Sequence, residues 1–401
     1  MSIADKLNQV AQNVPLVYQA GYDKGYEEGS KSGGGGSSVA VQKKDVNFYD
    51  YDGTRLYSYT VAEAQALTEL PELPTQAGLI CQGWNYDLAT IKSYKRAVDV
   101  GATYITDDGK TRLYIHIDTE GRMTVPLCFS QSVANGVEID WGDGSSTQKL
   151  SGTGTKSTTH TYSSTGDYVI TFTVANGCTL NFGNGKSSST QSIMGSTGSE
   201  GRVYNNMLRR IEIGNGVTSI KAYGFYYCLS LASITIPNGV SSIGNYAFQY
   251  CGYLASIIIP NGVSTIDKYA LGSCGSIKTI ILPDSVLSIG SYGFTSCNSL
   301  TSIILPNSVS TIGDRAFLYG YSLESIIIPS GVSSIEASTF NSCWGLAICD
   351  FTACTSVPSL ANTNAFGNVP SDCKIKVPSS LLSSWKAATN WSTYASQIVA
   401  G

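Results

Sequence analysis

Residues 236–254 read IPNGVSSIGNYAFQYCGYL, and the chain returns to this pattern every 23 residues. Four positions of the repeat are nearly constant: a proline, a leucine or isoleucine, a phenylalanine and a cysteine. In order, they are Pro237, Pro260, Pro283, Pro306 and Pro329; Leu208, Leu231, Leu254, Ile277, Leu300, Leu323 and Leu346; Phe225, Phe248, Leu271, Phe294, Phe317 and Phe340; and Cys228, Cys251, Cys274, Cys297 and Cys343, with Gly320 in place of the fifth cysteine. A period of this length with apolar residues at fixed positions predicts a leucine-rich solenoid over residues 208–346. Its coils would stack and share one core, with one cysteine per coil inside it.

The expected strand of each repeat holds one residue between two inward isoleucines, and by alternation that residue faces outward. The position carries Glu212 and Thr235, and then Ile258, Ile281, Ile304 and Ile327. Four outward isoleucines on adjacent coils predict an apolar stripe. A stripe of this kind marks a partner or self-association surface, or it is a ladder of β-branched side chains that stabilises the sheet. Both interpretations stay open at this point.

Tyrosines give a second candidate surface on the turn side of the coils. Tyr246, Tyr269 and Tyr292 recur with the period and are expected to be core or ladder residues. The irregular ones lie among Ser, Gly and Asn, which is the chemistry of antibody paratopes and also suits stacking against glycans. The candidate binding residues are Tyr226, Tyr227, Tyr250, Tyr253, Tyr319 and Tyr321.

The sequence of the repeat resembles the BspA-like leucine-rich repeats of bacterial and prophage surface proteins. The resemblance implies binding to host surfaces, extracellular matrix or other cells. It also implies a helical C-terminal cap over residues 347–401, with Lys374–Pro378 followed by helical segments at 381–388 and 391–399. Residues 46–117 are similar to a module found beside such repeats in prophages of Gram-positive bacteria.

Residues 1–29 are expected to form a helical docking or oligomerisation segment, with Pro15 interrupting it. A heptad seam supports this interpretation, and a frayed tail is the alternative. The seam consists of Ile3, Leu7, Val10, Val14 and Val17. Residues 30–38 contain Gly33–Gly36 and are expected to be a flexible linker.

Residues 39–112 predict a small α+β module. Two strands joined at Asp52-Gly53 should form a hairpin, helices are expected over 61–67 and 87–98, and Asp107-Asp108-Gly109 predicts a second hairpin into the strand that follows. Asp50 and Asp52 also match the nucleophile motif of haloacid-dehalogenase-type phosphatases. The hairpin turn explains both aspartates without catalysis, so the phosphatase is the minor alternative.

Residues 113–182 predict a β-sandwich. The stretches Trp141-Gly-Asp-Gly-Ser145, His160-Thr-Tyr162 and Gly166-Asp-Tyr168 resemble the PKD family of immunoglobulin-like domains, which implies a spacer or adhesion module. Asp140 and Asp143 are expected to shape a turn rather than bind Ca²⁺, and His160 to be structural. Residues 183–207 are Gly- and Ser-rich and predict an irregular connection.

The fold class is therefore mainly β with some α. The composition argues against two classes of function. Charged residues make up only 13% of the chain, the net charge is −4 and there are two His, which argues against nucleic-acid binding and His-based catalysis. We find no long apolar run and no leader-like N-terminus, so we expect synthesis in the bacterial cytoplasm with the 11 Cys as reduced thiols.

These features predict a non-enzymatic adhesion protein of a phage or prophage tail, or alternatively a bacterial cell-surface adhesin. The expected partners are a host-surface protein or glycan, other tail proteins and further copies of the chain, with a trimer as one arrangement. No cofactor, metal, nucleic acid or membrane is expected.

Overall fold

The computed structural model describes residues 45–94, 97–183, 192–195 and 204–401, all within the compact unit Lys44–Gly401. The predicted helix 1–29 and the linker 30–38 lie outside the described residues. So do the first residues of the small module and most of the Gly/Ser-rich connection. The described chain is mainly β, as expected.

Residues 45–106 form the predicted α+β module, a sheet with two short helices. The strand order is β2-β1-β4-β3, with β1 and β4 parallel. The elements are β1 Val46–Tyr49, β2 Arg55–Tyr59, α2 Val61–Ala66, β3 Leu79–Trp84, α3 Leu88–Ser93 and β4 Val98–Thr106. Thr60 and Glu63 begin α2 with a capping box, and the Asp87 carboxylate accepts from Thr90 N to begin α3. The predicted helix over 87–98 is too long, because α3 ends at Ser93 and Val98 already belongs to the sheet.

One of the two predicted hairpins is correct. β1 and β2 pair antiparallel around Asp52-Gly53, where Gly53 has φ +87° and Asp52 Oδ1 accepts from Thr54 N at 2.8 Å. The second prediction, at Asp107–Gly109, is wrong. β4 is flanked by β1 and β3, whereas the following strand β5 (Thr111–Ile117) is flanked by β10 and β12. Neither strand has a free edge for the other, so the turn joins two different sheets.

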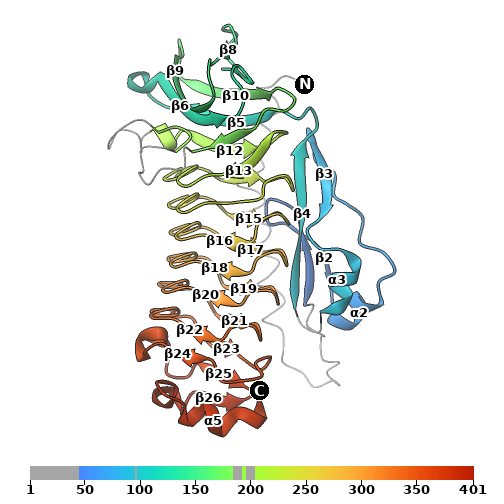
Figure 1. The fold of residues 1–401 in the computed structure, drawn as a ribbon, viewed down its shortest axis with the longest axis vertical. Helices are drawn as coiled ribbons and strands as arrows, with labels where there is room; N and C mark the ends of the chain where they lie inside the picture. The colour runs from blue at the N-terminus through green and yellow to red at the C-terminus, as the bar shows by residue number, and fades with distance from the viewer. Residues whose placement is uncertain (1–44, 95–96, 184–191, 196–203) are drawn as a thin grey trace, which may run out of the picture. The chain divides into compact units, whose positions relative to one another are not determined.

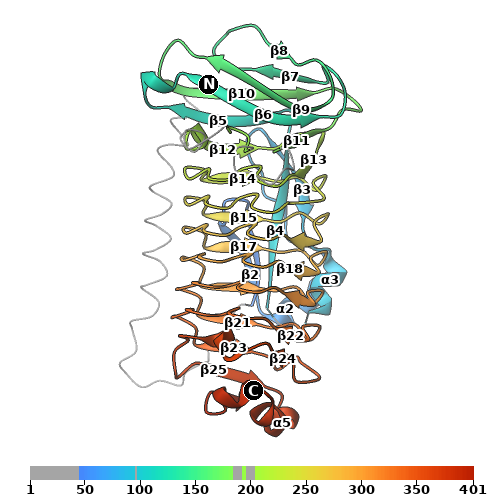
Figure 2. The same cartoon turned by 60° about the vertical axis from the view of Figure 1, so that its left-hand side comes forward.

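Two further sheets pack on each other and take their strands from residues 111–235. One has the order β14-β12-β5-β10-β7-β8 and the other β13-β11-β6-β9 (Figure 2). The new strands are β6 Thr124–Gln131, β7 Val137–Asp140, β8 Gln148–Lys149, β9 Gly154–Thr161, β10 Gly166–Val174, β11 Leu180–Phe182, β12 Leu208–Glu212, β13 Val217–Ile220 and β14 Ser233–Thr235, with the 3₁₀ turn η1 at Glu120–Arg122. Strands β12, β13 and β14 belong to the repeats. The sandwich and the solenoid therefore share one hydrophobic core.

The three signature stretches of the sandwich meet at one place. The His160 ring stacks on Trp141 at 4.8 Å, and a hydrogen bond of 2.7 Å joins His160 Nε2 to Asp143 Oδ2. Tyr162 donates its hydroxyl proton to Trp141 O at 2.9 Å. Asp140 and Asp143 accept from the backbone N–H groups two residues ahead of each, at 2.9 and 3.0 Å. Both aspartates therefore shape turns, and His160 contributes a stacked ring and a hydrogen bond to the sandwich.

The repeats stack as parallel coils in a 23-residue register (Figure 1). Each coil gives a short strand to one face: β15 Ser256–Ile258, β17 Thr279–Ile281, β19 Ser302–Ile304 and β21 Ser325–Ile327. Most coils give a second strand to another face: β16 Thr265–Ile266, β18 Ser288–Ile289, β20 Thr311–Ile312 and β22 Ser334–Ile335. The repeated Leu, Phe and Cys positions are buried throughout. The solenoid prediction is therefore confirmed, and each coil relies on its neighbours to cover its apolar edge.

Cysteine suits its position because a small apolar side chain with a weak donor fits between two coils. Cys251 Sγ donates to Phe225 O of the preceding coil at 3.2 Å, and Cys274 Sγ donates to Phe248 O at 3.2 Å. Burial raises the pKa of these thiols well above the ordinary value. The interior cysteine ladder is confirmed.

The C-terminal residues close the core. The elements are β23 Ile348–Asp350, β24 Ser359–Leu360, η3 Thr363–Phe366, β25 Lys374–Val377, η4 Ser379–Leu381, α5 Leu382–Ala387, η5 Trp391–Tyr394 and β26 Ile398–Ala400. Trp385 and Trp391 are buried and contact Phe351 at 5.3 and 5.5 Å. The predicted helix over 391–399 is only a 3₁₀ turn, since Ile398 enters the sheet beside β25.

Candidate binding surface

We number the coils from coil 1 (208–230) to coil 6 (323–345), and we call the residues that follow the Phe position in each coil the turn edge. The turn edge comprises residues 226–230, 249–253, 272–276, 295–299, 318–322 and 341–345. Backbone hydrogen bonds set its register: Tyr227 N donates to Gln249 O at 2.8 Å, and Tyr319 N donates to Asn341 O at 3.0 Å. Each turn-edge position therefore lies beside its counterpart in the next coil.

The recurring tyrosines form the predicted ladder just before the turn edge. The rings of Tyr223, Tyr246, Tyr269 and Tyr292 stack at 4.7, 5.1 and 4.3 Å, and the Arg315 guanidinium lies 5.4 Å from the last ring. All five residues have φ between 54° and 62°, a left-handed conformation that costs about 1–2 kcal/mol for a non-glycine residue. Stacked rings contribute about 0.5–1.5 kcal/mol each and offset that strain. The ladder is structural, because its ring faces are already in contact.

The turn edge itself carries exposed aromatic rings. Tyr253 is 70% exposed and Trp344 60%, followed by Tyr319 at 43% and Tyr321 at 37%. The Tyr321 and Trp344 rings stack at 4.5 Å, and Tyr319 lies 6.0 Å from Tyr321. The three tyrosines were predicted from the sequence, whereas Trp344 was not. The signal was present, because Trp344 follows Tyr321 by one 23-residue period.

The other three predicted tyrosines gather in coils 1 and 2. Tyr226, Tyr227 and Tyr250 are half-buried and contact one another at 5.0–5.8 Å. We call these three tyrosines, together with the exposed Tyr253 on the same turn edge of coil 2, bank A. Tyr319, Tyr321 and Trp344 in coils 5 and 6 form a second group, bank B. The structure therefore divides the candidate tyrosines between two places on one edge.

The isoleucine stripe is not the free surface that alternation predicts. Ile258 is 6% exposed and Ile281 1%, whereas Ile304 and Ile327 are partly exposed. The cover is β4 of the small module, which lies against β14, β15 and β17. β4 lies closest to Ile258 at Gly101, where the absence of a side chain leaves room: a Cβ there would lie 2.7 Å from Ile258 Cγ2. For Ile258 and Ile281, the prediction of an open partner surface is wrong, because the chain's own module occupies it.

Polar contacts fasten this module to coils 2–4. Ser256 Oγ donates to Tyr51 O at 2.9 Å, Asn238 N donates to Gln82 Oε1 at 2.9 Å, and Tyr86 OH donates to Leu282 O at 2.6 Å. Tyr94 OH donates to the Asp284 carboxylate. The outward positions of coils 1 and 2, Glu212 and Thr235, are also buried. The sheet face is thus covered over coils 1–4, which leaves the turn edge as the accessible aromatic surface.

Asp50 and Asp52, the residues of the phosphatase alternative, accept hydrogen bonds that hold the hairpin. Asp50 is buried; its Oδ1 accepts from Tyr104 OH at 2.7 Å, and its Oδ2 accepts from Gln76 Nε2 at 2.6 Å. Asp52 accepts from the turn backbone, as described above. Within the described ranges, no group of three or more His, Cys, Asp or Glu side chains is placed to hold a metal ion. The same part of the chain has no helix with the length and apolar run needed to cross a bilayer.

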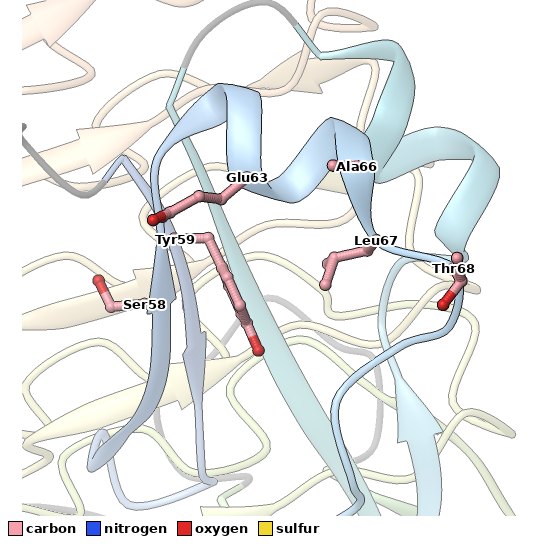
Figure 3. A pocket seen from close by; sticks show the side chains of 6 residues that line it. All are labelled: Ser58, Tyr59, Glu63, Ala66, Leu67 and Thr68. Atoms are coloured by element: carbon pink, nitrogen blue, oxygen red, sulfur yellow. The ribbon is translucent and has the colours of Figure 1, made fainter.

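A shallow, open pocket of about 500 Å³ lies in the small module (Figure 3). Its lining is Ser58, Tyr59, Glu63, Ala66, Leu67 and Thr68. The one charged group, the Glu63 carboxylate, already accepts from Thr60 N at 2.7 Å in the capping box of α2. The pocket therefore lacks a convergent set of free polar groups.

Comparison with known families agrees with this geometry. Residues 218–347 and 266–388 match the BspA type leucine rich repeat region, in 6 copies. The solenoid is a BspA-type leucine-rich repeat region. None of the curated proteins matches the chain.

Several solved structures are similar to parts of the chain. A leucine-rich repeat protein from Bacteroides ovatus is 27% identical over 41% of this chain and 44% of that protein, with a TM-score of 0.35. The leucine-rich repeat protein of T. pallidum is 26% identical over 48% of this chain and 83% of that protein, with a TM-score of 0.38. A leucine-rich cell surface protein from Faecalibacterium prausnitzii is 26% identical, covers 37% and 61%, and has a TM-score of 0.24. The chain thus spans less than half the length of the B. ovatus protein.

Proposed function

We propose that this protein is a non-enzymatic adhesion protein whose solenoid binds a receptor on a cell surface through the turn edge. The observation that carries the proposal is the presence of four exposed aromatic side chains on an edge whose residues carry no formal charge: Tyr253 in bank A, and Tyr319, Tyr321 and Trp344 in bank B. Tyr and Trp give large, rigid contact areas at a low cost in side-chain entropy. Exposed rings of this kind are typical of binding surfaces.

The other parts fit a spacer and an attachment segment. The convergence of Trp141, Asp143, His160 and Tyr162 supports a PKD-like sandwich, which would hold the solenoid away from its anchor. The heptad seam in residues 1–29 would attach or trimerise the chain. This order of parts favours a phage or prophage tail-associated protein that binds the bacterial host. A bacterial cell-surface adhesin is the second candidate, favoured by the BspA-type repeat itself.

Binding to cells tests the adhesive role. We expect the fluorescently labelled full chain to bind the surface of bacterial cells, and Tyr321→Ala and Trp344→Ala to weaken that binding. Leu287→Ala is the matched control, because Leu287 is 53% exposed on coil 4 but outside the turn edge. Equal binding by all three variants would exclude the turn edge as the adhesive surface.

Mass spectrometry of purified phage particles separates the two candidates. Peptides of this chain in purified particles would support the tail assignment. Their absence from particles, together with their presence in the cell-envelope fraction, would favour the bacterial adhesin instead.

A further inference from the structure

Between banks A and B, the turn edge of coils 3 and 4 carries only small or polar residues. The two intervening stretches are Gly272–Ser276 and Thr295–Ser299, which we call the interval. Backbone hydrogen bonds keep it in register with both banks: Ser276 N donates to Gly252 O at 3.1 Å, and Ser296 N donates to Leu318 O at 2.8 Å. The turn edge is therefore one continuous strip with aromatic rings at both ends.

The dimensions of the strip suit an extended ligand. Tyr253 in bank A and Tyr321 in bank B are three coils apart, which is about 14 Å at the spacing of neighbouring parallel strands. The interval is open at Gly275, where an added Cβ would meet nothing within 4 Å. A ligand that contacts both banks must therefore lie along the stack of coils.

The polar groups of the interval are available to such a ligand. Asn298 is exposed, and Ser276 and Ser299 are partly exposed. None of these three side chains makes a hydrogen bond to another residue of the described chain. Hydroxyl and amide groups both donate and accept hydrogen bonds, and the strip holds no charged side chain. The chemistry matches a ligand that is neutral and rich in hydroxyl groups.

From this geometry we infer that the turn edge binds a neutral oligosaccharide, whose sugar rings stack on banks A and B and whose hydroxyl groups bond to the interval. The inference rests on the proposed adhesive function and names its ligand class. A protein partner fits less well, because stable protein interfaces bury about 800 Å² per side around a packed apolar centre. Here the centre of the strip is glycine, serine and asparagine, and the apolar rings lie at its ends.

The test compares binding of the full chain to bacterial cells before and after mild periodate oxidation, which destroys sugar rings with neighbouring hydroxyl groups. A glycan array with cello-, malto- and mannan oligosaccharides then identifies the sugar, with heparin fragments as the anionic comparison. We expect binding to fall after periodate treatment and to persist after protease treatment of the cells. Binding that survives periodate but is lost after protease treatment, or an array signal confined to heparin, would overturn the inference.

Three variants test whether the ligand binds along the strip. Gly275→Leu fills the open interval, and Tyr253→Ala and Trp344→Ala each remove one exposed ring. Tyr253→Ala and Trp344→Ala are each expected to weaken binding about tenfold, the scale of one lost stacking contact. Gly275→Leu is expected to weaken binding because its side chain occupies the path of the ligand. Gly121→Leu is the matched control, since its Cβ also meets nothing within 4 Å but lies in η1 of the sandwich. Unchanged binding by Gly275→Leu would contradict the assignment.

The two proposals fail in different ways. If the chain binds cells through a protein receptor, the adhesive function stands and the sugar inference fails. If it binds array sugars but no cells, the ligand class stands and the adhesive function fails. Absence of both kinds of binding refutes both.

Discussion

Variants at the contact between Gly101 and Ile258 test whether the small module packs on the solenoid as described. A Cβ on Gly101 would lie 2.7, 2.9 and 3.0 Å from Ile258 Cγ2, Cδ1 and Cγ1. Carbon atoms do not approach so closely without displacement, so Gly101→Ala must move β4 or the isoleucine. Overpacking of a filled contact costs about 1–3 kcal/mol of folding free energy.

Ile258→Ala removes all three of those carbon atoms. Alone, it opens a cavity beneath β4 and should cost about 2–5 kcal/mol. In the double variant the new methyl group at position 101 occupies part of that cavity. The two changes together are therefore expected to cost about 1–3 kcal/mol less than the sum of the single changes.

The assay is urea unfolding of the wild type, both single variants and the double variant, with hydrogen exchange to locate the effect. In Gly101→Ala, faster exchange should appear in peptides that cover β4 and β15. Gly121→Ala, which meets nothing within 4 Å, serves as the neutral control. Additivity of the two changes within about 0.5 kcal/mol, or unchanged exchange at β15, would refute the packing argument.

Three further predictions follow from single residues. Burial raises the pKa of Asp99 to about 6, although the hydrogen bond that its carboxylate accepts from Asn47 Nδ2 at 3.1 Å lowers the pKa. The folded state therefore favours the protonated Asp99, and the stability that this group contributes is complete below about pH 4 and is lost as the pH rises through 6. Asp99→Asn should therefore be more stable than wild type by roughly 2–3 kcal/mol at pH 8 and lose this advantage at pH 4; an equal difference in urea unfolding at both pH values would contradict this. Burial also raises the pKa of Cys297 to about 12, and in native protein at pH 8 we expect a thiol reagent to modify the half-exposed Cys81 well before Cys297; mass spectrometry that finds early modification of Cys297 would refute a closed core. Tyr269 has φ +54°, so Tyr269→Val should be less stable than Tyr269→Gly by about 1–2 kcal/mol in thermal unfolding, and the reverse order would exclude backbone strain at this position.

The interior of the solenoid could be predicted because each coil repeats the same local constraints. Leucine, phenylalanine and cysteine return every 23 residues, and a parallel stack places equal positions beside each other. The tyrosine ladder followed from the same register. Trp344 could have been found in this way, since it shares its position in the coil with Tyr321.

The covered isoleucine stripe could not be predicted, because alternation reports which way a side chain points and not what lies above it. The cover comes from a module more than 150 residues earlier in the chain, as the contact between Gly101 and Ile258 shows. The one local signal was Gly101 itself, since a glycine inside a strand often marks the close approach of another element. The wrong hairpin at Asp107–Gly109 has a similar cause. Turn residues predict a reversal of the chain, but the partners of β4 and β5 are set by tertiary packing.

Photo-crosslinking on whole cells tests most directly whether the turn edge is the adhesive surface. A benzophenone amino acid would replace Ser299 at the centre of the strip, with Leu287 on the same coil as the control position. We expect light-dependent attachment of the full chain to a cell-surface component from position 299 and none from position 287. Attachment from position 287 alone, or equal attachment from both, would contradict it.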